Sequence, residues 1–143
     1  MPDIVAHLCP GQDPHEVLDR YYDRAGDRTD DVALLVAITT DTIVAAPAAR
    51  WADARAATGA RVYRYRVDHP GAGAQLRATH TTEVPLLFGT WNDGGPGERL
   101  GGQAPGTERV AGALVQAWAA FVHAGSPGWE GDLEVFGGAL TNA

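Results

Sequence analysis

The sequence contains no lysine, one cysteine and one serine. Its eleven basic residues are therefore all arginine, and a Walker-A phosphate loop, which requires a lysine, is absent. A single cysteine, Cys9, excludes an internal disulfide and any Cys-x-x-Cys metal or redox pair. His7, Cys9 and His15 lie close together in the sequence, but a structural zinc site needs four well-spaced ligands, so we expect no metal.

The charge balance and the hydropathy pattern exclude several classes of partner. A formal net charge of −7 at pH 7 argues against binding to nucleic acid or to an anionic membrane surface. We expect no membrane span, because the apolar runs stay short of the roughly 20 residues that cross a bilayer. The N-terminus has no basic region followed by an apolar core. This predicts no signal peptide and a cytoplasmic location, unless a missing N-terminal portion carries such a signal.

The composition predicts a folded chain, and capping patterns mark its first helix. With 45% hydrophobic and 20% charged residues, the 143 residues suit one globular domain. Asp13 is placed to cap a helix that has Pro14 at its first position, Glu16 in the capping-box position and Gly26 as its stop. Residues 1–12 are ambiguous, since their apolar run is too short to assign.

The segment from Val32 to Ile38 is apolar all round, which predicts burial on every side. It follows a cap formed by Thr29, Asp30 and Asp31, whose carboxylates are favourable at a helix N-terminus. Its β-branched residues would suit a buried strand. An alanine-rich run continues to Thr58, however, and favours a helix. Pro47 is expected to break or kink that run into two helices.

A strand with one buried face is predicted from Arg61 to Val67, where tyrosine or valine alternates with arginine. The loop that follows contains Gly71-x-Gly73, which echoes a dinucleotide-binding fingerprint. The third glycine of that fingerprint is missing, and no helix pattern follows. We therefore expect no nucleotide cofactor.

The last third of the chain combines a long loop, one amphipathic helix and a short strand. Residues 89–106 are rich in glycine and proline and predict a long loop. Thr107 is expected to cap a helix that Gly125 closes, with Pro127 preventing its continuation. Residues 133–136 are expected to form a final strand. The apolar positions of the helix keep helical spacing and comprise Val110, Leu114, Ala117, Trp118, Phe121 and Val122.

One histidine precedes a short apolar segment that ends in glycine. Thr81 or Thr82 is positioned to cap a short helix, Glu83 lies in its first turn, and Gly89 can end it in the left-handed conformation. His80 would then lie at a loop tip. Its ordinary pKa is near the pH at which a general base works best. An isolated loop histidine is more often a solvated surface residue.

The residues from His80 to Gly89 read His-x-x-Glu-Val-Pro-Leu-Leu-Phe-Gly. This pattern resembles the catalytic-histidine segment of the type-B carboxylesterases, a family of serine hydrolases with the α/β-hydrolase fold. The resemblance implies that His80 is the base of a catalytic triad. It also implies that Glu83 is the family's glutamate that supports the site without exchanging protons.

Other segments match the family in the expected order. Asp41-x-x-Val44-x-x-Pro47 resembles the family's Asp-x-x-Phe-x-x-Pro, with valine in place of phenylalanine. Residues 62–69 resemble the strand that leads to the histidine loop. Residues 118–129 resemble the family's late helix and the turn after it.

The resemblance covers residues 15–136 and therefore nearly the whole chain. It implies an α/β fold class, as the C-terminal part of an α/β-hydrolase that is mostly helical with one or two strands. On this interpretation residues 1–143 form a single partial domain, a fragment of a longer hydrolase.

A serine esterase also needs a nucleophile, and the sequence does not place one. Ser126 lies in Ala-Gly-Ser-Pro-Gly, which departs from Gly-x-Ser-x-Gly and follows a helix instead of a strand. In α/β-hydrolases the serine and the acid precede the histidine, yet no serine precedes His80. The family's Gly-Gly oxyanion loop is absent as well.

These observations predict a chain that contributes the catalytic histidine of a serine-dependent carboxylic ester hydrolase and is inactive alone. No nucleophile, metal or cofactor is expected within it. A small ester would be its substrate only if an N-terminal portion completed the site. The alternative is a non-catalytic module whose exposed helix faces bind a partner or self-associate.

Overall fold

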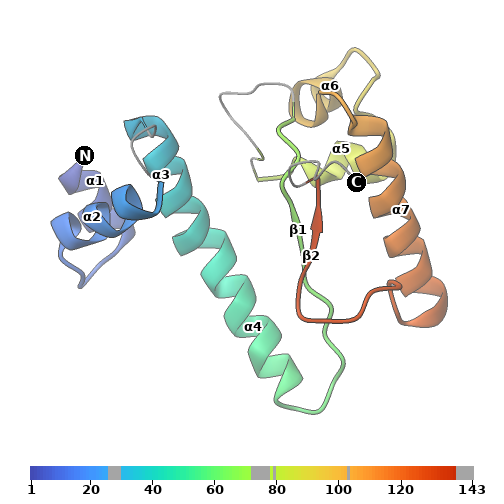
Figure 1. Cartoon of the computed structure of the whole chain (residues 1–143), viewed down its shortest axis with the longest axis horizontal. Helices are drawn as coiled ribbons and strands as arrows, with labels where there is room; N and C mark the ends of the chain where they lie inside the picture. The colour runs from blue at the N-terminus through green and yellow to red at the C-terminus, as the bar shows by residue number, and fades with distance from the viewer. Residues whose placement is uncertain (26–29, 72–77, 79, 103, 138–143) are drawn as a thin grey trace. The chain divides into compact units, whose positions relative to one another are not determined.

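The structure, a computed structural model, describes residues 1–25, 30–71, 78, 80–102 and 104–137. The chain divides into two compact units, Met1–Ala60 and Arg61–Ala143 (Figure 1). The described part of the first unit is helical, and the second combines helices with a two-stranded sheet. A mostly helical fragment with two strands is the content that the sequence predicted.

Aspartate caps begin two helices of the first unit. Asp13 Oδ1 accepts hydrogen bonds from the backbone N–H groups of His15 and Glu16, at 2.8 and 3.4 Å. Asp30 caps the next helix through a 2.8 Å bond from the N–H of Ala33. Both caps were predicted from the sequence. The helical elements of this unit are α1 (Pro2–Leu8), α2 (Pro14–Ala25), α3 (Asp31–Thr39), the π-helical segment η1 (Thr40–Ala45) and α4 (Ala46–Ala56).

α3, η1 and α4 follow one another without a break, so the predicted separation into two helices at Pro47 is wrong. Pro47 lies in the first turn of α4. Just before it, the N–H of Ala46 bonds to the carbonyl oxygen of Asp41, five residues back. Because proline lacks an N–H and crowds the preceding turn, a wider π-helical turn upstream accommodates it without ending the helix.

The continuous helix from Asp31 to Ala56 is 26 residues long and is apolar enough to cross a membrane by length and composition. The expectation that no apolar run reaches this length is therefore wrong, since the helix continues past Pro47. Core helices of water-soluble proteins pass the same test. Length and composition alone therefore do not assign this helix to a membrane.

Only one side of this long helix is buried within the first unit. Leu34 and Ile38 are fully buried, whereas Val32 and Trp51 are exposed, and α4 contributes no buried residue. The expectation that residues 32–38 are buried on every side is therefore not met within this unit. The core of the unit comprises Val5, Cys9, Val17, Leu18, Leu34 and Ile38.

The second unit is built on a parallel pair of short strands. Tyr65 lies opposite Glu134, and Val67 lies opposite Phe136. The first strand begins at Tyr65 and not at Arg61, and it ends where predicted. The elements are β1 (Tyr65–Val67), α5 (Glu83–Phe88), α6 (Pro96–Gly101), α7 (Thr107–Ala124) and β2 (Glu134–Phe136). The core comprises Leu86, Val110, Ala111, Leu114, Ala117 and Phe136.

The helix α6 interrupts the segment that was predicted as one long loop. Two of the glycines in this segment are needed for close packing. A Cβ atom at Gly97 would collide with the carbonyl oxygen of Thr90, and one at Gly101 would lie 2.8 Å from the Cβ of Trp91. The glycine-rich composition therefore did not reveal α6, which packs against residues 90–91.

Replacing Ile38 by alanine should destabilise the first unit by about 2–5 kcal/mol, because the side chain is fully buried and its removal leaves a cavity. Ile43→Ala is the matched control on the same continuous helix. Ile43 is 59% exposed, so its loss should cost less than about 0.5 kcal/mol. Urea unfolding followed by circular dichroism measures both. Equal losses would contradict the described packing of α3 on α1 and α2.

Candidate active site

His80 lies in a tight turn directly before α5. Thr81 in this turn has a φ of 73°, which is uncommon for a residue other than glycine. Its hydroxyl donates to the carbonyl oxygen of His80 at 2.5 Å, and its carbonyl accepts from the N–H of Val84 at 3.1 Å. Local hydrogen bonds thus define the backbone at His80. Residues 72–77 and 79, which include part of the nucleotide-like pattern, lie outside the described residues.

Buried residues immediately after this turn anchor it to the second core. Thr82 and Leu86 are each 1% exposed, and Leu86 belongs to the same cluster as Val110 and Leu114 of α7. Thr82 occupies the N-cap position of α5, but without the side-chain cap bond that the sequence predicted. Gly89 ends the helix with a φ of 70°, as predicted. His80 is therefore only two residues from the buried residue Thr82.

The two predicted site residues have different surroundings. The side chain of His80 is exposed, and none of the described residues forms a hydrogen bond with its imidazole. Glu83 is partly exposed and lies near the phenol of Tyr65. Burial raises the pKa of Tyr65, and the charge of Glu83 adds to this effect while Trp118 opposes it. No hydrogen bond joins Glu83 to His80 within the described chain.

Ser126 lies in the turn that ends α7, as its sequence context predicts. Gly125 caps the helix with a φ of 68°, and its N–H bonds to the carbonyl oxygen of Phe121 at 2.8 Å. A nucleophile elbow needs a strand before the serine and a helix after it. Here a helix precedes Ser126, and the next element is the strand β2. This serine therefore lacks the setting of an esterase nucleophile.

Metal chemistry finds no support in the described part of the chain. His, Cys, Asp and Glu side chains from these residues form no group of three or more that could hold a metal ion. His7, Cys9 and His15 accordingly form no such group.

A buried histidine that the sequence analysis did not single out links the end of β1 to the start of α7. His69 is 2% exposed, and its Nε2 lies 2.7 Å from Oγ1 of Thr107. The Thr107 hydroxyl donates to the carbonyl oxygen of Ala104 at 2.7 Å, so it accepts from the Nε2–H of His69. Burial lowers the pKa of His69 and favours the neutral ring.

The same bond explains why Thr107 is not the helix cap that was predicted. Gly106, with a φ of 87°, occupies the N-cap position of α7, and Thr107 is the first helical residue. Its hydroxyl is used by His69 and Ala104 instead. A threonine at the start of an amphipathic helix can be either the helix cap or a buried hydrogen-bonding residue, and the sequence alone does not distinguish the two.

Comparison with known proteins shows the family and the fold to which these elements belong. The chain belongs to the carboxylesterase family, whose sequence model matches residues 12–136. A carboxylesterase from Geobacillus stearothermophilus, solved as a crystal structure at pH 6.2, is similar with 29% sequence identity and a TM-score of 0.69. The match covers 89% of this chain and 26% of that one, so this chain spans about a quarter of the solved relative's length.

Because burial lowers the pKa of His69, the second unit should lose stability as the pH falls. The unfolded chain binds a proton near the ordinary histidine pKa of about 6.5, whereas the folded chain resists protonation until a lower pH. The free energy of unfolding should therefore be highest above about pH 7 and should decrease from there toward the folded pKa. Urea unfolding followed by tryptophan fluorescence measures this dependence.

His69→Gln keeps an N–H donor for Thr107 but does not titrate, so it should flatten this pH dependence. His15→Gln removes an exposed histidine from the other unit and is the control, with the dependence retained. An unchanged slope in His69→Gln would show that burial of this ring does not govern the effect.

Proposed function

We propose that this chain supplies the general base of a serine-dependent carboxylic ester hydrolase, and that the base is His80. One observation carries the proposal: an exposed imidazole, without a hydrogen-bond partner among the described residues, begins a turn that the buried residues Thr82 and Leu86 anchor. Membership of the carboxylesterase family supports it, since this segment resembles the family's catalytic-histidine segment.

In this reaction His80 takes the proton of a serine hydroxyl as the serine oxygen attacks the ester carbonyl carbon. The imidazolium then gives that proton to the oxygen of the leaving alcohol. Water attacks the resulting acyl-enzyme in the same way, with His80 again as the base. A general base must lie about 3 Å from the proton donor, and an imidazole without a partner among the described residues can approach to that distance. Glu83 supports the site without exchanging protons.

The nucleophile, the orienting acid and the oxyanion donors would come from an N-terminal portion. The chain corresponds to 26% of the solved carboxylesterase, and Ser126 lacks the setting of a nucleophile. Even hydrolases without a working triad retain catalysis mainly through the oxyanion hole and substrate binding. A chain without those parts should have activity near background.

Exposed apolar side chains support an origin in a larger protein. Burying them at about 25 cal/mol per Å² would contribute several kcal/mol, comparable to the net stability of a domain. We propose that the sheet of the N-terminal portion covers them, so that the long helix contacts protein and not lipid, and residues 1–143 complete one domain. The most exposed of these side chains are Val32, Ile43, Trp51, Phe88 and Val122.

The same exposed side chains favour a second candidate, a non-catalytic interaction module. In that case the faces of the long helix and of α7 bind a partner protein or a second copy of the chain. The module requires neither His80 nor an N-terminal portion. Association that persists after His80→Ala, with no gain of esterase activity from any N-terminal portion, distinguishes it from the hydrolase fragment.

The isolated chain should not hydrolyse p-nitrophenyl acetate above the rate of an equal concentration of free imidazole. The reason is the lack of a placed nucleophile. Initial rates over a range of substrate concentrations test this. Saturable turnover that survives His80→Ala but disappears in Ser126→Ala would mean that Ser126 is a nucleophile after all.

Co-expression with the N-terminal portion of a related carboxylesterase should restore hydrolysis of short-chain esters. His80→Ala should then lower kcat by at least about 10³-fold, because removing a triad member leaves only the oxyanion hole and binding. Glu83→Gln should lower it less. His123→Ala, at an exposed position on α7, is the control and should leave kcat unchanged. A stable, active complex that is insensitive to His80→Ala would overturn the assignment of the base.

A further inference from the structure

The first unit contains a hollow of about 370 Å³ between α2 and the long helix, bounded by the end of α1. Three arginines line it: Arg20 and Arg24 from α2, and Arg50 from α4. Asp41 is the sole carboxylate among its lining residues. Residues 1–60 contain five arginines and ten carboxylates, so this unit has a net negative charge. Three of its five arginines nevertheless line this one hollow.

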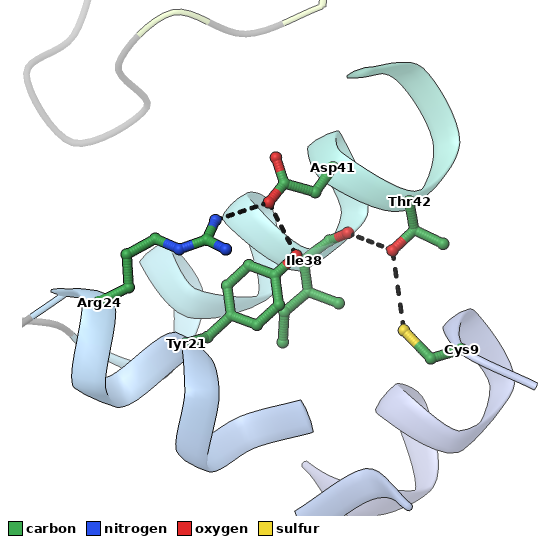
Figure 2. Close-up of polar contacts among 6 residues, drawn as sticks. All are labelled: Cys9, Tyr21, Arg24, Ile38, Asp41 and Thr42. Carbon is green, nitrogen blue, oxygen red and sulfur yellow. Dashed lines mark hydrogen bonds and ion pairs between the residues drawn. The ribbon is translucent and has the colours of Figure 1, made fainter. Parts of the chain in front are cut away.

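The carboxylate of Asp41 is already engaged. The hydroxyl of Tyr21 donates to its Oδ2 at 2.8 Å, and Nη1 of Arg24 lies 3.0 Å from the same oxygen (Figure 2). Burial and the neighbouring carboxylate raise the pKa of Tyr21 to about 12, so its phenol remains a donor. Asp41 therefore neutralises Arg24 and forms no ion pair with the other two arginines of the hollow.

The remaining two guanidinium groups are available to an external anion. Arg20 bonds only to a neutral group, the amide oxygen of Gln12, at 2.8 Å. Arg50 has no hydrogen bond or ion pair with any other residue that the structure describes. A guanidinium offers paired N–H donors whose geometry matches the two oxygens of a carboxylate.

Part of the remaining lining of the hollow is unsuited to a fully hydrated ion. The Thr42 hydroxyl donates to the carbonyl oxygen of Ile38 at 2.6 Å, so its oxygen can only accept, and Cys9 Sγ lies 3.7 Å from it (Figure 2). Ala46 adds an exposed methyl group to this lining, whereas Val17 lies beneath it and is 1% exposed. An aliphatic chain can contact such a surface, whereas inorganic phosphate would leave it unfilled.

We propose that this hollow binds a small organic carboxylate, with the carboxylate on Arg50 and Arg20 and an aliphatic body against Ala46 and the accessible edge of Cys9. Such a site goes beyond the proposed hydrolase function and involves none of its residues. Arg20 also borders a neighbouring hollow lined by Asp13, Glu16 and Asp19, whose charges weaken its attraction for anions. Arg50 is therefore the principal contact.

Sodium butyrate is the probe, and butyramide is its neutral isostere. Titration of the full chain by saturation-transfer NMR should show binding of butyrate and much weaker binding of butyramide. Arg50→Gln should weaken butyrate binding by about tenfold, the effect of one charge-assisted hydrogen bond. Arg55→Gln removes the same charge from the same helix outside the hollow and should leave binding unchanged. Equal binding of butyrate and butyramide, or equal effects of the two variants, would overturn the proposal.

Cys9, the only cysteine, provides an independent readout from inside the hollow. Iodoacetate carries a carboxylate, and iodoacetamide is neutral. The ratio of their alkylation rates should be higher in the folded chain than in urea, should fall in Arg50→Gln, and should fall when butyrate is added. A ratio equal to that in urea, or protection of Cys9 from both reagents, would show that the hollow does not admit a carboxylate. Protection by inorganic phosphate as strong as by butyrate would mean that the site takes a simple oxyanion, which also overturns the proposal.

Discussion

The contact of α5 with α7 is the constraint on which the candidate active site depends. α5 has six residues, too few to be stable as an isolated helix, so it exists only through its packing. Leu86 supplies that packing against Leu114 and Val110 in the second core. Because His80 is a short turn away from α5, the same apolar contact defines the position of the His80 backbone. A hydrophobic interaction thereby determines where a polar reaction can take place.

The sheet and the long helix indicate how much of a larger fold this chain contains. Two parallel strands of three residues each are below the size at which a sheet is stable alone, and parallel sheets are normally covered on both faces. The long helix likewise buries one side and exposes another. Both features are those expected of the end of a layered α/β fold, in agreement with the carboxylesterase family.

Local interactions allowed much of this structure to be predicted. The caps at Asp13 and Asp30 and the stops at Gly89 and Gly125 each depend on residues within a few positions, so the sequence pattern contains all the information they need. The candidate base was identified from a contiguous segment around His80, and the family from that segment together with three others in the expected order. Helical periodicity predicted α7. Which of its faces are exposed, however, depends on the segments that pack against it.

The sequence by itself determined the family, the candidate base and the helices whose ends are capped locally. The tertiary structure decided features that depend on residues far apart. The pairing of His69 with Thr107 spans 38 positions, and the bond of Tyr21 to Asp41 spans 20. Neither pairing is indicated by the sequence around its two residues. For the same reason, α6 and the hollow at Arg50 were not predicted from the sequence, since each depends on contacts between separate segments.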